Sequence, residues 1–249
     1  PLEAQTKLSE AIFLASRVLE DDPVQAWKEH NSALRKKTDW LNGRNFKDLH
    51  FAGPGTDLKV GLADDHEWMG GASQAQNGVI CNPNIPSEEV FTTPHYLRVE
   101  GHVSSTKPLS HQGSLIDEIR VEFKEGAIVD AKASKGEKIF KKVLDSDDGA
   151  RRLGEVALVP DSSPISQSGL LFYNTLFDEN AACHIALGQC YSKCFKSKQN
   201  LSQEEIKSRG GNSSMIHIDW MIGSKEIDID GLSENGEITP VFRKGEWCV

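Results

Sequence analysis

The sequence predicts a mixed α/β (α+β) protein in which N-terminal helices precede a domain built on a mixed sheet. The order of elements is the first reason, because apolar residues at helical spacing dominate up to about residue 45, and short strands and helices alternate after it. Composition is the second. Of the 249 residues, 38% are hydrophobic and 26% are charged, which is typical of a globular protein with a sizeable core.

Two helices are expected in the N-terminal segment, residues 1–45. The first is indicated by apolar residues at helical spacing, namely Leu8, Ile12, Ala15 and Leu19. Its pattern stops at Asp21-Asp22-Pro23, and a second helix runs from about Val24 to Leu41. The remainder, residues 46–249, is interpreted as one domain.

Strands begin after the helices. Alternation of apolar and polar residues predicts a strand over 58–62 and a hairpin formed by 119–123 and 128–131. The stretch 66–86 between them is rich in Gly, Asn and Pro and is interpreted as a long loop.

The second half alternates helices and strands. A short helix is expected at 140–144, a strand at 155–159, and a helix after Asp178-Glu179 that would carry His184 and Tyr191. A capping box starting at Ser202 opens a further helix, and 215–222 forms a strand. Asn235-Gly236 predicts a tight hairpin turn.

Charge and cysteine content exclude several classes of function. With 28 basic and 37 acidic residues the net charge is −9, which argues against nucleic acid as a partner. The one basic run, 193–198, is interpreted as a solvated helix end. No apolar stretch approaches the roughly 20 residues of a membrane helix, so no membrane partner is expected. Five irregularly spaced cysteines favour reduced thiols in the cytoplasm. Because the chain opens on Pro1, we expect a fragment or a processed product.

Two carboxylates and two imidazoles lie close together in the sequence, within predicted helices and strands. They are Glu179, His184, His217 and Asp219. Ionisable groups among apolar residues are costly unless they are paired, and carboxylate with His is a common ligand set for Zn²⁺ and similar cations. The pattern therefore predicts a metal-dependent hydrolase.

The strand at 215–222 supports this hypothesis. Successive residues of a strand point to opposite faces, so His217 and Asp219 share one face while Ile218 and Trp220 share the other. A surface strand with solvated polar residues is the competing interpretation. Met215 and Met221 on either side of the pair favour burial.

Three glutamates are weaker candidates for metal ligands when each is considered alone. Glu155 begins an apolar strand and Glu89 borders the long loop, but each alone is more often a solvated carboxylate. Glu179 at a helix N-terminus also serves there as a simple capping acid.

Five longer sequence motifs resemble those of a known protein family. The strings NIPSEEVFTTP (84–94), LGEVALVP (153–160), SGLLFYNTLFDENAACH (168–184), HIDWMIGS (217–224) and GEW (245–247) resemble the thermophilic aminopeptidase family. The resemblance covers the chain from about Gly53 to its C-terminus. It implies that 46–249 is the metal-binding catalytic domain. It also implies that 1–45 is the end of, or the connection from, a further N-terminal domain.

The resemblance also implies chemistry at particular positions. It places metal ligands at Glu89, Glu155, Glu179, His184, His217 and Asp219, and an active-site tyrosine at Tyr191. The implied protein is a homodimeric metallo-aminopeptidase acting on peptides with a free N-terminus. It would use two divalent ions, Zn²⁺ with Co²⁺ or Mg²⁺ as substitutes, to activate a water. Glu155, Glu179 and Tyr191 are its expected catalytic groups, and the roles of the two glutamates are not separated.

Two alternatives remain open from the sequence. A two-metal phosphoesterase uses the same ligand types. An inactive metal-binding fragment would have the ligands without the activity.

Overall fold

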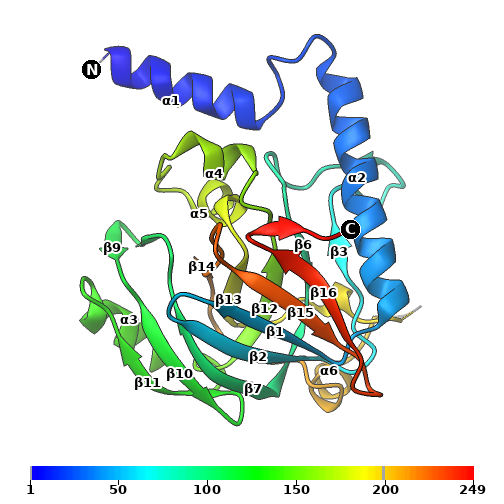
Figure 1. Ribbon diagram of the computed structural model, residues 1–249, viewed down its shortest axis with the longest axis vertical. Helices are drawn as coiled ribbons and strands as arrows, with labels where there is room; N and C mark the ends of the chain where they lie inside the picture. Colours follow the sequence, from blue (N-terminus) through cyan, green and yellow to red (C-terminus); the bar gives the residue numbers. More distant parts are fainter. Residues whose placement is uncertain (1, 198–199) are drawn as a thin grey trace.

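Two antiparallel sheets form the core of the protein, with two helices at the N-terminal end (Figure 1). This computed structural model describes residues 2–197 and 200–249. The α+β class is confirmed, and within the described residues every strand ladder is antiparallel, as given by the pairings of the two large and two small sheets.

The N-terminal helices differ in how they pack. Helix α1 (Leu2–Ala15) buries only its last residue, whereas α2 (Pro23–Arg44) buries Leu34, Thr38 and Leu41. Asp22 caps α2 by accepting a hydrogen bond from the Gln25 amide at 3.0 Å. The expected end of the first helix near Leu19 was too late, because Arg17 adopts a left-handed conformation (φ 58°) that breaks the helix.

The larger sheet has eight strands in the order β11-β10-β7-β2-β1-β15-β16-β17. Their bounds are Asp48–Gly53 (β1), Thr56–Leu62 (β2), Pro94–Ser104 (β7), Arg120–Lys124 (β10), Ala127–Lys132 (β11), Asp228–Leu232 (β15), Ile238–Arg243 (β16) and Glu246–Trp247 (β17). The expected hairpin is β10–β11, and the expected turn at Asn235-Gly236 joins β15 to β16 with Gly236 at φ 82°.

The smaller sheet has five strands in the order β14-β13-β12-β6-β3. Their bounds are Met69–Gly70 (β3), Val90–Thr92 (β6), Leu153–Leu158 (β12), His184–Gly188 (β13) and His217–Met221 (β14). Its members Val156, Ile185, Ile218 and Trp220 are at most 4% exposed and belong to the main hydrophobic cluster. Since side chains alternate along a strand, the residues between them face the other way, and that second face positions the site.

Short elements connect and flank the sheets. They are two small hairpins, Ser73–Gln74 with Ile80–Cys81 (β4, β5) and Leu109–His111 with Ser114–Ile116 (β8, β9), helices Glu137–Leu144 (α3), Pro164–Ser168 (α4), Thr175–Asp178 (α5) and Gln203–Ser208 (α6), and 3-10 turns Glu179–Ala181 and Ser192–Cys194. The capping box at Ser202 is confirmed at the start of α6. The expected loop at 66–86 contains the short strands β3, β4 and β5.

One expected element was wrong. Residues 184–188 form the buried strand β13, and neither His184 nor Tyr191 lies on a helix. Glu179 starts a short 3-10 turn after α5 and does not begin a long helix. Of the basic run, Lys193 lies in the turn Ser192–Cys194, whereas Lys198 falls outside the described residues. No helix in the described part of the chain is long and apolar enough to cross a membrane.

Candidate metal centre

Three neighbouring strands bring four of the candidate ligands to one face. Strand pairing puts Glu155 of β12 opposite Ala186 of β13, and Ala186 opposite Asp219 of β14. His184 and His217 lie two residues from this row on their own strands and therefore share its face. Ala186 has a small side chain, which leaves space between the two carboxylates.

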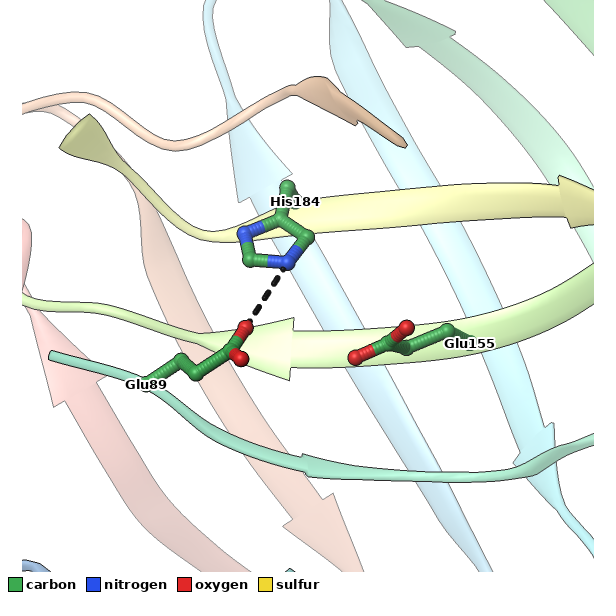
Figure 2. Close-up of side chains that lie close together, drawn as sticks. All are labelled: Glu89, Glu155 and His184. Atoms are coloured by element: carbon green, nitrogen blue, oxygen red, sulfur yellow. Dashed lines mark ion pairs between the residues drawn. The ribbon is translucent and has the colours of Figure 1, made fainter. Parts of the chain in front are cut away.

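Glu89 completes this set from the residue before β6. Its Oε2 lies 3.1 Å from Nε2 of His184, and both side chains are buried. Figure 2 shows the carboxylates of Glu89 and Glu155 pointing toward a common space next to the His184 ring. In the same way, Nε2 of His217 lies 3.1 Å from Glu155 Oε2 and 3.3 Å from Asp219 Oδ1.

Both imidazoles have their second nitrogen fixed by the backbone. Nδ1 of His217 lies 2.7 Å from the Gln189 carbonyl, and Nδ1 of His184 lies 3.2 Å from the Ala182 carbonyl. A carbonyl only accepts hydrogen bonds, so Nδ1 carries the proton in both rings. This leaves Nε2 as the ligand atom, and a carbonyl behind the ring is the usual support for a metal-binding His.

Ligand atoms here fall into two clusters, each with atoms within 4.8 Å of one another. One contains Glu89, Glu155 and His184, and the other contains Glu155, His217 and Asp219. Glu155 therefore belongs to both. Two carboxylates and one imidazole per cluster make an oxygen-and-nitrogen donor set that suits Zn²⁺ and neighbouring divalent ions.

Buried polar atoms that lack a hydrogen-bond partner indicate whether the clustered residues could bind a cation. Among the described residues, Glu89 Oε2, His217 Nε2 and Asp219 Oδ1 are buried and make no hydrogen bond of good geometry. Buried polar atoms without partners are costly, and all three belong to the two clusters. A cation in each cluster would satisfy them, so the residues fit the metal.

In the absence of cations, the pKa values of Glu155, His184 and His217 are raised, so these side chains retain protons. Burial, together with the charges of Glu89 and Asp219, raises the pKa of Glu155 to about 7. Burial opposes charging of His184, yet the Glu89 carboxylate, 3.1 Å away, raises its pKa to about 10. Likewise, burial opposes charging of His217, but contacts with Asp219 and Glu155 raise its pKa to about 11. Bound cations would displace these protons.

Glu179 and Tyr191 lie beside the clusters and belong to neither. Glu179 is 7% exposed, and burial and the charge of Glu89 raise its pKa to about 9. The Tyr191 ring lies 4.9 Å from the His217 ring between centroids, and burial followed by the Glu155 charge raises the pKa of its hydroxyl. Both side chains line the same cavity as the clusters. The expected burial holds for Asp219, which is 8% exposed, and for Met221, whereas Met215 on the other side of the pair is 80% exposed.

A cavity of about 470 Å³ opens over this face of the sheet. Its walls include all seven candidate residues, Glu89, Glu155, Glu179, His184, Tyr191, His217 and Asp219. The structure thus brings together every residue that the sequence singled out.

Sequence reasoning missed a group of buried residues behind Glu89. Glu88 pairs with Arg17 (Oε1 to Nη1, 2.7 Å), and its backbone amide donates to Asn180 Oδ1 at 2.7 Å. His30 of α2 contacts both the Ser87 carbonyl (2.7 Å) and Arg17 (3.0 Å). These contacts hold Glu89 and the Glu179 turn against the N-terminal helices. The one available signal was Glu88 itself, an acid next to another acid before an apolar strand.

Comparisons with known proteins find relatives over nearly the whole chain. The family described as "Thermophilic metalloprotease (M29)" matches residues 2–247. Aminopeptidase T of Thermus thermophilus is 53% identical over 247 residues, which is 99% of this chain and 60% of that protein. Aminopeptidase PepS of Streptococcus thermophilus is 48% identical over the same shares. The chain thus spans about 60% of the length of these curated relatives.

Solved structures give the same result for the fold. Wild-type AmpT from Thermus thermophilus superposes with a TM-score of 0.89 at 52% identity, covering 96% of this chain and 58% of that one. A 2,5-dihydroxypyridine dioxygenase from Pseudomonas putida KT2440 superposes with a TM-score of 0.58 at 13% identity, covering 88% and 60%. The second likeness concerns the fold alone.

Proposed function

Because the chain belongs to the thermophilic metalloprotease family M29, we propose that it provides the catalytic site of a metal-dependent aminopeptidase. The observation that carries this proposal is the pair of carboxylate–imidazole clusters sharing Glu155 at the base of one cavity. The names of the relatives supply the reaction class, since those proteins are aminopeptidases.

Each cluster would hold one divalent cation. Glu89 and His184 would hold the first, His217 and Asp219 would hold the second, and Glu155, which belongs to both clusters, would serve both. Zn²⁺ suits this donor set best, with Co²⁺ or Mg²⁺ as substitutes. Such a pair of cations, when bound, lowers the pKa of a water and polarises the scissile carbonyl.

Glu179 is assigned the proton transfer. It lines the cavity but lies in neither cluster, so its carboxylate stays available while Glu155 is engaged on both sides. As general base it takes a proton from the attacking water, and as general acid it returns a proton to the departing amine. The sequence left Glu155 and Glu179 as equal candidates, and the cluster geometry favours Glu179.

Tyr191 is assigned to the developing negative charge on the carbonyl oxygen. Its ring stands over His217, and its raised pKa keeps the hydroxyl protonated. A protonated hydroxyl donates a hydrogen bond, and such a donor is worth most where charge develops in the transition state.

The carboxylates of the site would limit cleavage to the N-terminal residue of a peptide. Each has two oxygens, so Glu89 and Asp219 retain an oxygen that can accept a hydrogen bond from the α-amino group of the substrate. An internal peptide bond has no such amino group and leaves those oxygens desolvated without a partner, which is costly.

Hydrolysis of aminoacyl-p-nitroanilides tests the proposal. The protein is first treated with a chelator and then supplied with Zn²⁺ or Co²⁺. We expect turnover that is lost with the chelator, restored by the metal, and absent for the Nα-acetyl derivative of the same substrate. Turnover that survives the chelator, or equal cleavage of the acetylated compound, would contradict the proposal.

A phosphoesterase control uses p-nitrophenyl phosphate under the same conditions. Phosphate ester cleavage without nitroanilide cleavage would replace the aminopeptidase with a phosphoesterase. Metal binding without either activity would indicate a metal-binding fragment.

A further inference from the structure

The cavity over the clusters has a strongly uneven charge distribution. Four carboxylates line it, namely Glu89, Glu155, Glu179 and Asp219. Among the described residues that line it, Lys193 is the one lysine or arginine. Lys193 is therefore the one side chain of these two types that can offer a permanent positive charge to an anionic group in this cavity.

Lys193 is held in place by aromatic rings. Its Nζ lies 5.4 Å from the centroid of the Phe91 ring and 5.6 Å from that of Tyr191. The two rings lie 5.5 Å apart and both line the cavity. A cation over aromatic faces is attracted by them and stays at one location.

No partner in the described part of the chain neutralises this lysine. The ion pairs and hydrogen bonds there include none to Nζ of Lys193, although four carboxylates share its cavity. The neighbouring Lys196, by contrast, donates to Asn45 Oδ1 at 2.7 Å. Lys193 therefore has all three ammonium hydrogens available for a ligand.

Lys193 also marks one end of the cavity. A second cavity of about 750 Å³ begins there, sharing Lys193 and Met69 with the first. The Tyr191 ring lies near both groups, because its centroid is 4.9 Å from that of His217 and 5.6 Å from the Lys193 ammonium. The first cavity is thus acidic at the clusters and has a basic group, Lys193, where it adjoins the second cavity.

This charge distribution matches a short peptide zwitterion. An extended chain advances at most about 3.3–3.6 Å per residue, so the C-terminal carboxylate of a dipeptide or tripeptide lies one or two such steps beyond the scissile bond. With the amino end at the clusters, Lys193 beside Tyr191 is the basic group in this cavity that can meet that carboxylate.

We propose that Lys193 is the binding site for the C-terminal carboxylate of the substrate, which makes dipeptides and tripeptides with a free C-terminus the preferred class. This inference rests on the proposed aminopeptidase function and deepens it. An ammonium–carboxylate contact at an exposed side chain such as Lys193 contributes up to about a fivefold change in affinity.

The test compares Leu-Ala with its amide, Leu-Ala-NH₂, using the Co²⁺-loaded protein. The two differ in the terminal charge and share the scissile bond. We expect the wild-type protein to favour the free acid about fivefold in kcat/KM, chiefly through KM. Lys193→Met removes the ammonium and should abolish this ratio, while Lys193→Arg keeps the charge and should retain it. Lys196→Met, a lysine outside the cavity, is the matched control and should retain the ratio as well.

The outcomes separate the two hypotheses. If the wild-type protein cleaves neither compound, the aminopeptidase proposal fails. If it cleaves acid and amide equally well, the aminopeptidase proposal stands and the carboxylate site is overturned. An equal loss on both compounds in Lys193→Met, with the acid-to-amide ratio unchanged, would assign Lys193 to a purely structural role and also overturn it.

Discussion

Glu155 and Asp219 occupy one row of the five-stranded sheet, on either side of Ala186. Because β12, β13 and β14 are hydrogen-bonded neighbours, this row is rigid, and the two carboxylates keep a fixed spacing. A larger side chain at position 186 would project into the space between them. The sheet register thereby sets the separation of the two clusters.

Single substitutions should remove the two cations separately. Glu89→Gln weakens only the cluster with His184, and Asp219→Asn weakens only the cluster with His217, because an amide is a weaker ligand than a carboxylate. We expect each variant to retain about one cation after dialysis, measured by elemental analysis. Glu137→Gln, an exposed acid on α3 paired with Lys141, is the control and should keep both. Loss of both cations from either variant would argue against separate sites.

Glu179→Gln should separate catalysis from metal binding. This side chain lines the cavity outside both clusters, so the variant should bind the metal as the wild-type protein does. Its kcat on a leucyl-nitroanilide should fall by about 10²–10⁴-fold, the usual contribution of a general acid–base group. If the variant instead loses a cation, Glu179 is a ligand, and its role as base is wrong.

The ion pair between Arg17 and Glu88 should support the fold near Glu89. Both side chains are largely buried, at 14% and 6% exposed. Arg17→Met leaves the buried Glu88 carboxylate with only the His30 imidazole, whose Nε2 lies 3.6 Å away and whose pKa is lowered by burial, and this loss costs about 3–5 kcal/mol of unfolding free energy.

Adding Glu88→Gln to this variant removes the unpaired charge and should recover part of the loss. Denaturant unfolding of the two single variants and the double variant measures the coupling between the residues. Additive effects would show that the pair does not act as a unit.

The metal-free protein should become less stable as the pH rises. Below the unfolded pKa of about 4.5, Glu155 is protonated in both states; above it, only the folded state, with a pKa near 7, keeps the proton. His184 acts in the same direction. Its folded pKa of about 10 contributes stability that is fully present below about 6.5 and is lost as the pH rises through 10. At these two groups the folded state binds more protons. Above about pH 7, where His66, whose pKa burial lowers to about 4, is neutral in both states, the unfolding free energy therefore falls with pH.

Bound metal should reverse this trend, because the ligands must lose their protons to bind it. Thermal unfolding at about pH 5.5, 7 and 8.5, with chelator and with Co²⁺, measures both trends. The stabilisation by Co²⁺ should increase across this range. A constant difference between the two series would show that the site protons are not displaced.

Much of the site could be predicted from the sequence, but its arrangement could not. Alternation along 217–221 correctly put His217 and Asp219 on one face, since strand periodicity is local information. The residues 181–188 misled because their Ala and Leu favour helix, and a short apolar run does not distinguish a buried strand from a helix. Pairing with β12 and β14 on both edges decides in favour of the strand.

Long-range contacts account for the rest. Glu88 is fixed by Arg17 of the N-terminal segment and by Asn180, which is 92 positions away in the chain. No periodicity or motif in the sequence encodes such pairings. Similarly, the position of Lys193 over Phe91 depends on tertiary packing between residues far apart in the sequence.

The most direct test is the number of Co²⁺ ions bound per chain by the wild-type protein and by Glu155→Ala, measured by calorimetric titration of the chelated protein. Because Glu155 belongs to both clusters, the wild-type protein should bind two ions tightly, and Glu155→Ala should bind both weakly. If Glu155→Ala still binds two ions with unchanged affinity, Glu155 is not a shared ligand and the proposed centre is wrong.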